Sequence, residues 1–274
     1  MALLGTLTSS VSALDSFTQG LDTVGNNIAN INTTAFKGSS VSFADTFSDL
    51  GTQVNSTTQN FSQGSLQTTG VTTDLGISGN GYFIVQQPTT SGAAPNQYAT
   101  RDGQFTFNSA GNLVTQQGYQ VMGLVGGSAT STPTGTYGAI TLGTPPTGLS
   151  LASVAIDTSG NVIATYNDGS TATVGQVLLQ NFSDQSQLQS VGGNLFTNMG
   201  EAGPLTTGTT LTTANAPGQN SLGTIQSGTL EQSNVDLTQE FSNMITLQRA
   251  FEANSRMITI SDSILEDVVN MKTH

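Results

Sequence analysis

The residues that most often carry out chemistry in proteins are scarce in this chain and poorly placed for it. The single histidine is His274, the last residue, so a histidine general base or a Ser-His-Asp triad is excluded unless the terminus folds back. The sequence has no cysteine, which excludes a thiolate nucleophile, a cysteine-ligated metal and a disulfide framework. We therefore expect no cofactor and no metal site.

The carboxylates also lack the arrangement that catalysis needs. Those that could pair for acid–base hydrolysis of a glycoside each lie beside a glycine or at an expected turn, where aspartate is favoured for backbone reasons. They are Asp74, Asp102, Asp157, Asp168, Asp184 and Glu201. DTSGN at Asp157 lacks the alternating ligands of a calcium loop, and the glycines of SGNGYF open a strand rather than a helix. The sequence predicts a protein that is not an enzyme.

Composition excludes further classes of function. Of the 274 residues 35% are hydrophobic and only 8% charged, and 32 glycines with many Thr, Ser and Asn favour an all-β body. The net charge is −12, and the cations are scattered at Lys37, Arg101, Arg249, Arg256 and Lys272. We therefore expect no nucleic-acid binding and no membrane insertion. No basic residue precedes Lys37, so the sequence predicts no cleaved secretory signal.

The apolar pattern predicts a long helix at each end of the chain. Neither Gly nor Pro occurs from Asp236 to Lys272, and apolar residues recur there every seven positions at Leu237, Met244, Phe251, Ile258 and Leu265, with Phe241 on a flanking line. Such a helix of about 35 residues is ~52 Å long. Asp236 followed three residues later by Gln239 predicts a capping box at its start.

The N-terminal helix carries the same signal. It is expected from about Leu3 to Asn30, with one apolar line at Leu7, Leu14, Leu21 and Ile28 and a second that includes Leu4 and Val11. Two interpretations fit equally well: a two-helix buttress packed on a β domain, or helices that also pack on copies from other chains. Small residues at Gly25, Ala253 and Ser255 would let such helices approach closely.

Between the helices we expect an extended arm and then a β domain. Residues 33–71 form the arm, with Phe36, Phe43, Phe47 and Phe61 as isolated apolar anchors. Residues 72–228 read as short strands separated by Gly, Asn and Asp. FTFNSAGNLVT and VAIDTSGNVIA share one plan, a strand, a Gly-Asn turn and a returning strand, so both predict a hairpin.

Four segments resemble blocks of the bacterial flagellar rod and hook protein family. The first is GNNIANINTTAFKGSSVSF, which matches the family's N-terminal signature but has Ala35 where the family usually has Gly. The others are DLGISGNGYFIV, YATRDGQFTFNSAGNLVTQQGYQVMG and GTLEQSNVDLTQEFSNMITLQRAFEANSRMI. They follow the family's order and span nearly the whole chain.

The resemblance implies a mainly β fold with terminal helices, in which an antiparallel inner β domain accompanies an N- and C-terminal coiled-coil pair. The implied domains are a helix over 1–32, the arm over 33–71, the β domain over 72–228 with a reduced insertion at 126–149, and a helix over 229–274. Assembly into a tube would use the axial helices at Leu4, Leu7, Val11, Leu14, Leu21, Ile28, Leu237, Phe241, Met244, Phe251, Ile258 and Leu265. The linker motif is Asn26, Asn27, Asn30, Phe36, Lys37 and Phe43.

Within the family, the short linker after the first signature favours the hook subunit, a structural protein that polymerises into a flexible universal joint. A distal or proximal rod subunit is the alternative, because the chain lacks a large outer domain. The implied partners are further copies of the chain in a helical polymer, the rod, hook-cap and hook–filament junction proteins, and the flagellar export apparatus. The implied location is extracellular, in the hook or basal body.

An alternative of another class is a secreted β-rich adhesin or carbohydrate-binding module, which the lack of Trp and the dispersed tyrosines disfavour.

Overall fold

The computed structural model describes residues 2–46, 51–88, 96–126, 136–143, 148–205 and 211–271, without the side chains of 2–4 and 268–269. The chain forms two compact units. The helical unit comprises Met1–Asn32, Lys37–Ser62 and Asn234–His274, and the β unit comprises Thr33–Phe36 and Gln63–Ser233. Both chain ends therefore belong to one unit, and the middle of the chain forms the other.

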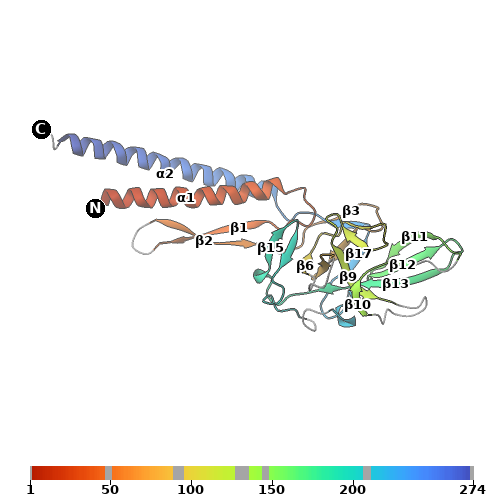
Figure 1. Cartoon of the computed structure of the whole chain (residues 1–274). Coiled ribbons are helices and arrows are strands. Elements are labelled where there is room, and N and C mark those ends of the chain that lie inside the picture. The colour runs from red at the N-terminus through yellow and green to blue at the C-terminus, as the bar shows by residue number, and fades with distance from the viewer. Residues whose placement is uncertain are drawn as a thin grey trace. The chain divides into compact units, whose positions relative to one another are not determined.

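The helical unit consists of two long helices and a β-hairpin. Helix α1 spans Ala2–Ala29 and helix α2 spans Leu237–Met271, and the two lie side by side with both chain termini at the same end (Figure 1). Strands β1 (Ser39–Asp45) and β2 (Thr52–Gln59) pair antiparallel, with a register shift between Ser42 and Phe43. The helices run antiparallel to each other, because the chain enters α1 and leaves α2 at that shared end.

Local hydrogen bonds fix both helix ends that face the rest of the chain. The Nδ2 of Asn30 donates to the carbonyl oxygen of Asn26 at 2.9 Å, which caps the end of α1. At the start of α2 the Asp236 carboxylate accepts from the N–H groups of Thr238 and Gln239 at 2.8 and 3.3 Å. The predicted capping box is half correct, since the Gln239 side chain donates to Asn243 instead.

Small residues on α1 allow the hairpin to pack closely on it. The hydroxyls of Ser12 and Ser16 both donate to the carbonyl oxygen of Thr52, at 2.6 and 2.8 Å. The rings of Phe17 and Phe43 meet edge to face with centroids 5.9 Å apart. The arm predicted over 33–71 thus contains a two-stranded sheet that the sequence pattern did not reveal.

The β unit is built from short strands, most of them in one large antiparallel sheet. Along its main path the strand order is β11-β12-β13-β9-β5-β6-β16-β15, while β4 pairs with β17 and β3 with β18. Short 3₁₀ helices occupy Gln185–Gln187 and Thr213–Asn215. The strands are β3 (Leu66–Thr68), β4 (Leu75–Ser78), β5 (Tyr82–Gln86), β6 (Gln97–Thr100), β7 (Phe105–Phe107), β8 (Leu113–Thr115), β9 (Gln120–Val125), β10 (Thr136–Ala139), β11 (Leu151–Ile156), β12 (Asn161–Tyr166), β13 (Thr171–Val177), β14 (Leu179–Gln180), β15 (Gln189–Gly192), β16 (Leu195–Thr197), β17 (Thr224–Ser227) and β18 (Thr229–Glu231).

Both predicted hairpins are confirmed, and they share one turn. β7 pairs with β8 and β11 with β12. In the first turn Asn108 Oδ1 accepts from the N–H groups of Ala110 and Asn112, and in the second Asp157 Oδ1 accepts from those of Ser159 and Asn161. The glycine of each turn has a positive φ, 81° at Gly111 and 78° at Gly160.

The core of the β unit is an apolar cluster of buried side chains. Its largest side chains include Phe83 and Phe105, whose rings meet at 5.1 Å and nearly at right angles. Burial of this size is the dominant stabilising contribution for a unit rich in glycine. The expected fold class is confirmed in its coarse form: the chain is mainly antiparallel β, with one helix at each end.

Candidate assembly surface

Two asparagines tie the segments of the helical unit together. Asn27, buried at the end of α1, donates through Nδ2 to the carbonyl oxygen of Ser39 at 2.7 Å and to Glu240 Oε1 at 3.1 Å, and its Oδ1 accepts from the Ser39 N–H at 2.9 Å. One amide therefore joins α1, β1 and α2. Asn234 accepts from the Gly38 N–H at 2.9 Å and donates to the carbonyl oxygen of Asn60 at 2.7 Å. The linker motif predicted from the sequence includes Asn27 but not Asn234.

The predicted linker motif is mostly a set of structural contacts inside the two units. Asn26 and Asn30 form the end of α1, and Phe43 packs on Phe17. Lys37 is buried, and its ammonium group donates to the carbonyl oxygen of Ser62 at 2.8 Å. Phe36 is half-buried in the β unit, whereas Phe47 lies outside the described residues.

Helices α1 and α2 approach each other closely at Gly20 of α1. A Cβ at this position would lie 3.2 Å from Leu247 Cδ1 of α2 and 3.2 Å from Phe43 Cζ of β1. At Gly25, the glycine expected to allow close approach, a Cβ would meet nothing within 4 Å. Next to Gly20 is a groove of about 270 Å³ whose lining includes Phe43, Glu240 and Leu247. In the described part of the chain the buried Oε2 of Glu240 has no hydrogen-bond partner.

The apolar lines expected to form the axial seam are half-covered in the single chain. On α1, Leu7, Leu14, Leu21 and Ile28 are all half-buried. The fully buried row of α1 is a different one, made of Ser10, Ala13, Ser16, Gly20, Val24 and Asn27. On α2, Met244, Ile258 and Leu265 are half-buried, whereas Leu237, Phe241 and Phe251 are exposed, as is Val11 on α1. Nothing is described of the Leu4 side chain.

Helix α2 exposes more apolar surface than the heptad pattern predicted. Leu237, Phe241 and Ile245, four residues apart, form one exposed row in its first half. A second row follows in its second half at Met257, Ile260, Ile264 and Met271. At 100° per residue the two rows lie about a third of a turn apart. Exposed apolar rows on a 35-residue helix indicate surfaces that another molecule covers.

The candidate catalytic carboxylates are turn residues. The Oδ1 atoms of Asp102, Asp157, Asp168 and Asp184 each accept the backbone N–H two residues further on, at 2.9–3.2 Å. Hydrogen bonds from Ser170 lower the pKa of Asp168 below its usual value, and hydrogen bonds from Ser186 do the same for Asp184.

Among the described residues no group of three or more His, Cys, Asp or Glu could hold a metal ion. Neither described helix is long and apolar enough to cross a membrane.

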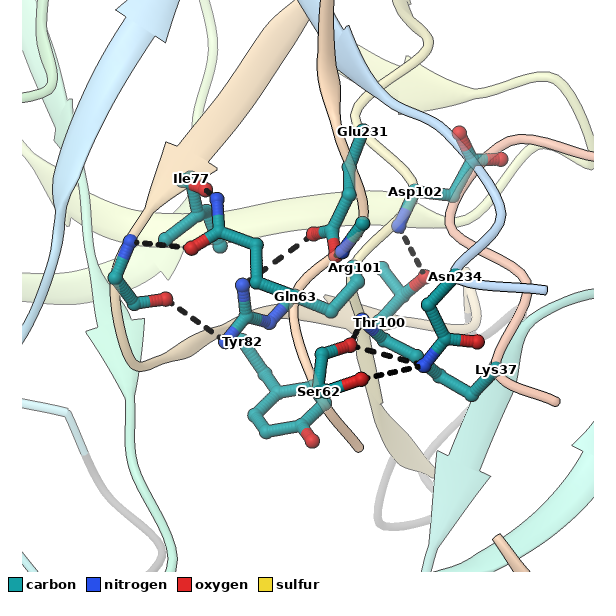
Figure 2. A network of polar contacts seen from close by, with 12 residues as sticks. Lys37, Ser62, Gln63, Ile77, Tyr82, Thr100, Arg101, Asp102, Glu231 and Asn234 are labelled. Atoms are coloured by element: carbon teal, nitrogen blue, oxygen red, sulfur yellow. Dashed lines mark hydrogen bonds and ion pairs between the residues drawn. The ribbon is translucent and has the colours of Figure 1, made fainter. Parts of the chain in front are cut away.

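The β unit contains a fully buried ion pair. Arg101 Nη1 lies 3.3 Å from Glu231 Oε2, and side-chain exposures are 4% and 0%. Arg101 also donates to the Gly79 carbonyl oxygen at 3.0 Å, and its guanidinium carbon lies 5.0 Å from the ring centre of Tyr82 (Figure 2). Glu231 Oε1 accepts from the Gly64 N–H at 2.8 Å. Burial raises the pKa of Tyr82 to about 12. Two of the five cations of the chain, Lys37 and Arg101, are thus internal.

Comparison with known proteins places the chain among structural proteins of the bacterial flagellum. Residues 7–37 match the flagella basal body rod protein family, residues 76–164 the flagellar hook protein FlgE/F/G D1 domain, and residues 226–271 the flagellar basal body rod FlgEFG protein C-terminal family. The flagellar basal-body rod protein FlgG of Bacillus subtilis is 35% identical over 98% of this chain and 100% of its own length. The FlgG of Borreliella burgdorferi is 32% identical over 92% of each chain.

The chain belongs to the flagellar rod and hook (FlgE/F/G) family. It is therefore a structural axial protein of the flagellum and a component of the rod and hook assembly. The narrower expectation of a hook subunit is less well supported than its alternative. The flagellar hook protein FlgE of Helicobacter mustelae is 43% identical, but over only 44% of this chain and 31% of its own length.

Proposed function

We propose that this chain is a subunit of the flagellar rod, of the kind named FlgG, which assembles through its terminal helices into a helical polymer with other axial proteins. The assignment to the rod rather than the hook rests on one observation. The relatives named as rod proteins align from end to end, through both helices and the β unit, whereas the hook relatives align over less than half of the chain.

The helical unit supports assembly through the terminal helices. Within one chain α1 and α2 already form an antiparallel pair, which leaves exposed rows of apolar side chains on α2 and Val11 on α1. Met244, Ile258 and Leu265 on α2 are also only half-buried in the single chain. Neighbouring copies would complete a coiled-coil layer by covering the exposed rows, because long helices gain most of their stability from packing along an apolar face.

The remaining expectations about partners follow from this assignment. The neighbours of a rod subunit are other rod proteins and, at the end of the rod, the hook. Export would use the flagellar apparatus without cleavage of a signal peptide. An adhesin or a carbohydrate-binding module is not favoured by any contact in the described residues.

Position in the flagellum tests the choice between rod and hook. Antibodies against the β unit, used on isolated hook–basal bodies in the electron microscope, should label the straight rod and leave the curved hook unlabelled. Labelling along the curved hook would replace the rod assignment by the hook assignment.

Assembly through α2 is tested with a single substitution. Phe251→Asp places a charge in the exposed apolar surface of α2 without touching the β unit, so it should prevent incorporation into basal bodies while the β unit keeps its melting temperature. The control is Val191→Asp, at an exposed apolar residue on β15. If Phe251→Asp is incorporated as well as the unmodified chain, α2 does not form the assembly surface.

A further inference from the structure

Charged residues form one row on the outer face of each terminal helix. On α1 the row is Val11, Asp15, Thr18 and Asp22, with steps of four, three and four residues, and all four are exposed. It lies on the side of α1 opposite the buried row that includes Ala13, Gly20 and Val24, as the 100° step per residue requires. In the described residues neither Asp15 nor Asp22 has an ion-pair partner, and Asp15 accepts only from Gln19.

The complementary row is on α2. It consists of Ile245, Arg249, Glu252, Arg256 and Ile260, with steps of four, three, four and four residues, and all five are exposed. Arg249 pairs with Glu252 at 2.9 Å on its own helix. Among the described residues these two arginines are the only exposed cations, because Lys37 and Arg101 are buried. The chain has a net charge of −12, so these arginines can attract an acidic surface of another copy.

The two rows match in a single antiparallel register. If Asp15 lies opposite Arg256, the equal seven-residue spacing brings Asp22 opposite Arg249. The same register brings Val11 opposite Ile260, and these apolar side chains are 57% and 53% exposed in the single chain. Two opposite charges and one apolar contact thus coincide over about three turns of helix.

The antiparallel direction follows from the fold and from helical assembly. In a polymer built by one repeated head-to-tail contact, every copy keeps the same direction along the axis. Since α1 and α2 are antiparallel within one chain, α1 of one copy and α2 of the next are antiparallel too. Within the chain Gly20 faces Leu247 and Asn27 bonds Glu240, so the proposed register shifts the neighbour by about four residues, or ~6 Å, along the helices.

We propose that Asp15 and Asp22 of α1 form ion pairs with Arg256 and Arg249 of α2 in an adjacent copy, and that this contact fixes the axial stagger between neighbouring subunits. The inference rests on the proposed function, since it requires a polymer. The partner it commits to is a second copy of this chain, because the two rows have the same spacing and opposite charge. Paired charges at the edge of a helical seam set partner and register more than they add affinity.

Cysteine crosslinking tests the register in the assembled rod, since the chain has no cysteine of its own. Two single-cysteine copies that carry tags of different size are expressed together in cells that lack the unmodified chain, and basal bodies are isolated and mildly oxidised. The pairs Asp22→Cys with Arg249→Cys and Asp15→Cys with Arg256→Cys should give a crosslinked heterodimer. The pairs Asp15→Cys with Arg249→Cys and Asp22→Cys with Arg256→Cys, about 10 Å out of register, should not.

Charge exchange provides an independent measurement. Asp15→Arg with Asp22→Arg places like charges opposite each other and should lower incorporation into basal bodies by roughly tenfold or more. Adding Arg249→Asp and Arg256→Asp to the same chain should restore most of it. Glu201→Arg, an exposed charge reversal in the β unit, is the control for net charge and should have no effect.

The outcomes separate this proposal from the proposed function. If the unmodified chain is absent from basal bodies, the rod assignment fails. If it is present but the in-register cysteine pairs do not crosslink, or crosslink no better than the out-of-register pairs, the ion-pair contact is wrong while the rod assignment stands. Restoration by charge exchange together with in-register crosslinking establishes the contact.

Discussion

Replacing Arg101 by methionine should destabilise the β unit more than any other single change of charge in the described chain. Methionine has a similar length and no charge, so the substitution removes three interactions at once: the ion pair with Glu231 at 3.3 Å, the hydrogen bond to the Gly79 carbonyl oxygen at 3.0 Å and the contact with the Tyr82 ring at 5.0 Å. What remains is the Glu231 carboxylate, which has no solvent exposure and has lost its ion pair with Arg101.

The expected loss is about 3–5 kcal/mol, because removing one member of a buried ion pair leaves the other charge buried without that partner. A charge-assisted hydrogen bond of about 1.5–3 kcal/mol and a desolvated cation–π contact of about 2 kcal/mol give a loss of the same size. For a unit of this length such a loss lowers the melting temperature by roughly 6–20 °C. The measurement is thermal and urea unfolding followed by the near-ultraviolet signal of the tyrosines, since the chain has no tryptophan.

The double-mutant cycle makes the reasoning specific to the pair. Glu231→Gln keeps an acceptor for the Gly64 N–H, so adding it to Arg101→Met should recover about 1–3 kcal/mol of the loss. Arg249→Met is the matched control: its ion pair with Glu252 is on the surface, with side chains 76% and 55% exposed, and should contribute less than about 1 kcal/mol. A loss below about 1 kcal/mol for Arg101→Met, or additive effects in the cycle, would refute the argument.

The structure also predicts the effects of three further substitutions on stability and packing. Ala35 is buried with φ of 56°, a left-handed conformation unfavourable for residues with a Cβ, so Ala35→Gly should stabilise the β unit by about 1 kcal/mol in urea unfolding; unchanged or lower stability would contradict this. Gly20→Leu should separate α2 and the hairpin from α1 and reduce the helical circular dichroism, whereas Gly25→Leu, with open space around its Cβ, should not; equal effects would argue against close packing at Gly20. Burial raises the pKa of Asp102, so this carboxyl favours the folded state at low pH and loses that contribution as the pH rises above the value of 3.8 that it has in the unfolded chain. Asp102→Asn should therefore weaken the fall in stability from pH 4 upward, as measured by urea unfolding at several pH values, and an unchanged pH profile would exclude Asp102 as its source.

The helices and hairpins could be predicted from the sequence because their signals are local. A seven-residue apolar repeat without Gly or Pro defines α2, and the Gly-Asn turns after Asn108 and Asp157 define two hairpins. The short strands predicted over residues 72–228 include the two that flank SGNGYF, but these two do not pair with each other. Strand β4 pairs with β17, and β5 pairs with β6, β9 and β14. A local pattern specifies a strand and its turn, whereas the partner of a strand depends on residues far away in the chain.

The candidate site could be predicted only in part, because the burial of a side chain depends on residues far away in the chain rather than on the local sequence pattern. No local pattern predicts that Arg101 and Lys37 are buried, and only their distant partners, Glu231 and the Ser62 carbonyl oxygen, show that both are internal. The sequence pattern does not reveal hairpin β1–β2, because its strands are mostly polar and have no buried residue. Its residues alternate between exposed and half-buried, a weak signal compared with an apolar core strand.

The small residues of α1 explain why apolar side chains remain free on α2. Ser16, Gly20 and their neighbours bring the hairpin and Leu247 so close to α1 that the contact is made by short side chains and backbone rather than by the leucine line. A helix that packed through Leu7, Leu14 and Leu21 alone would fill its seam within one chain. Because the close contact uses the small residues instead, the leucines stay half-buried and the rows ending at Ile245 and Met271 stay exposed. The small residues of α1 therefore allow close packing on one side of α1, and they leave apolar surface on α2 that a neighbouring copy can cover.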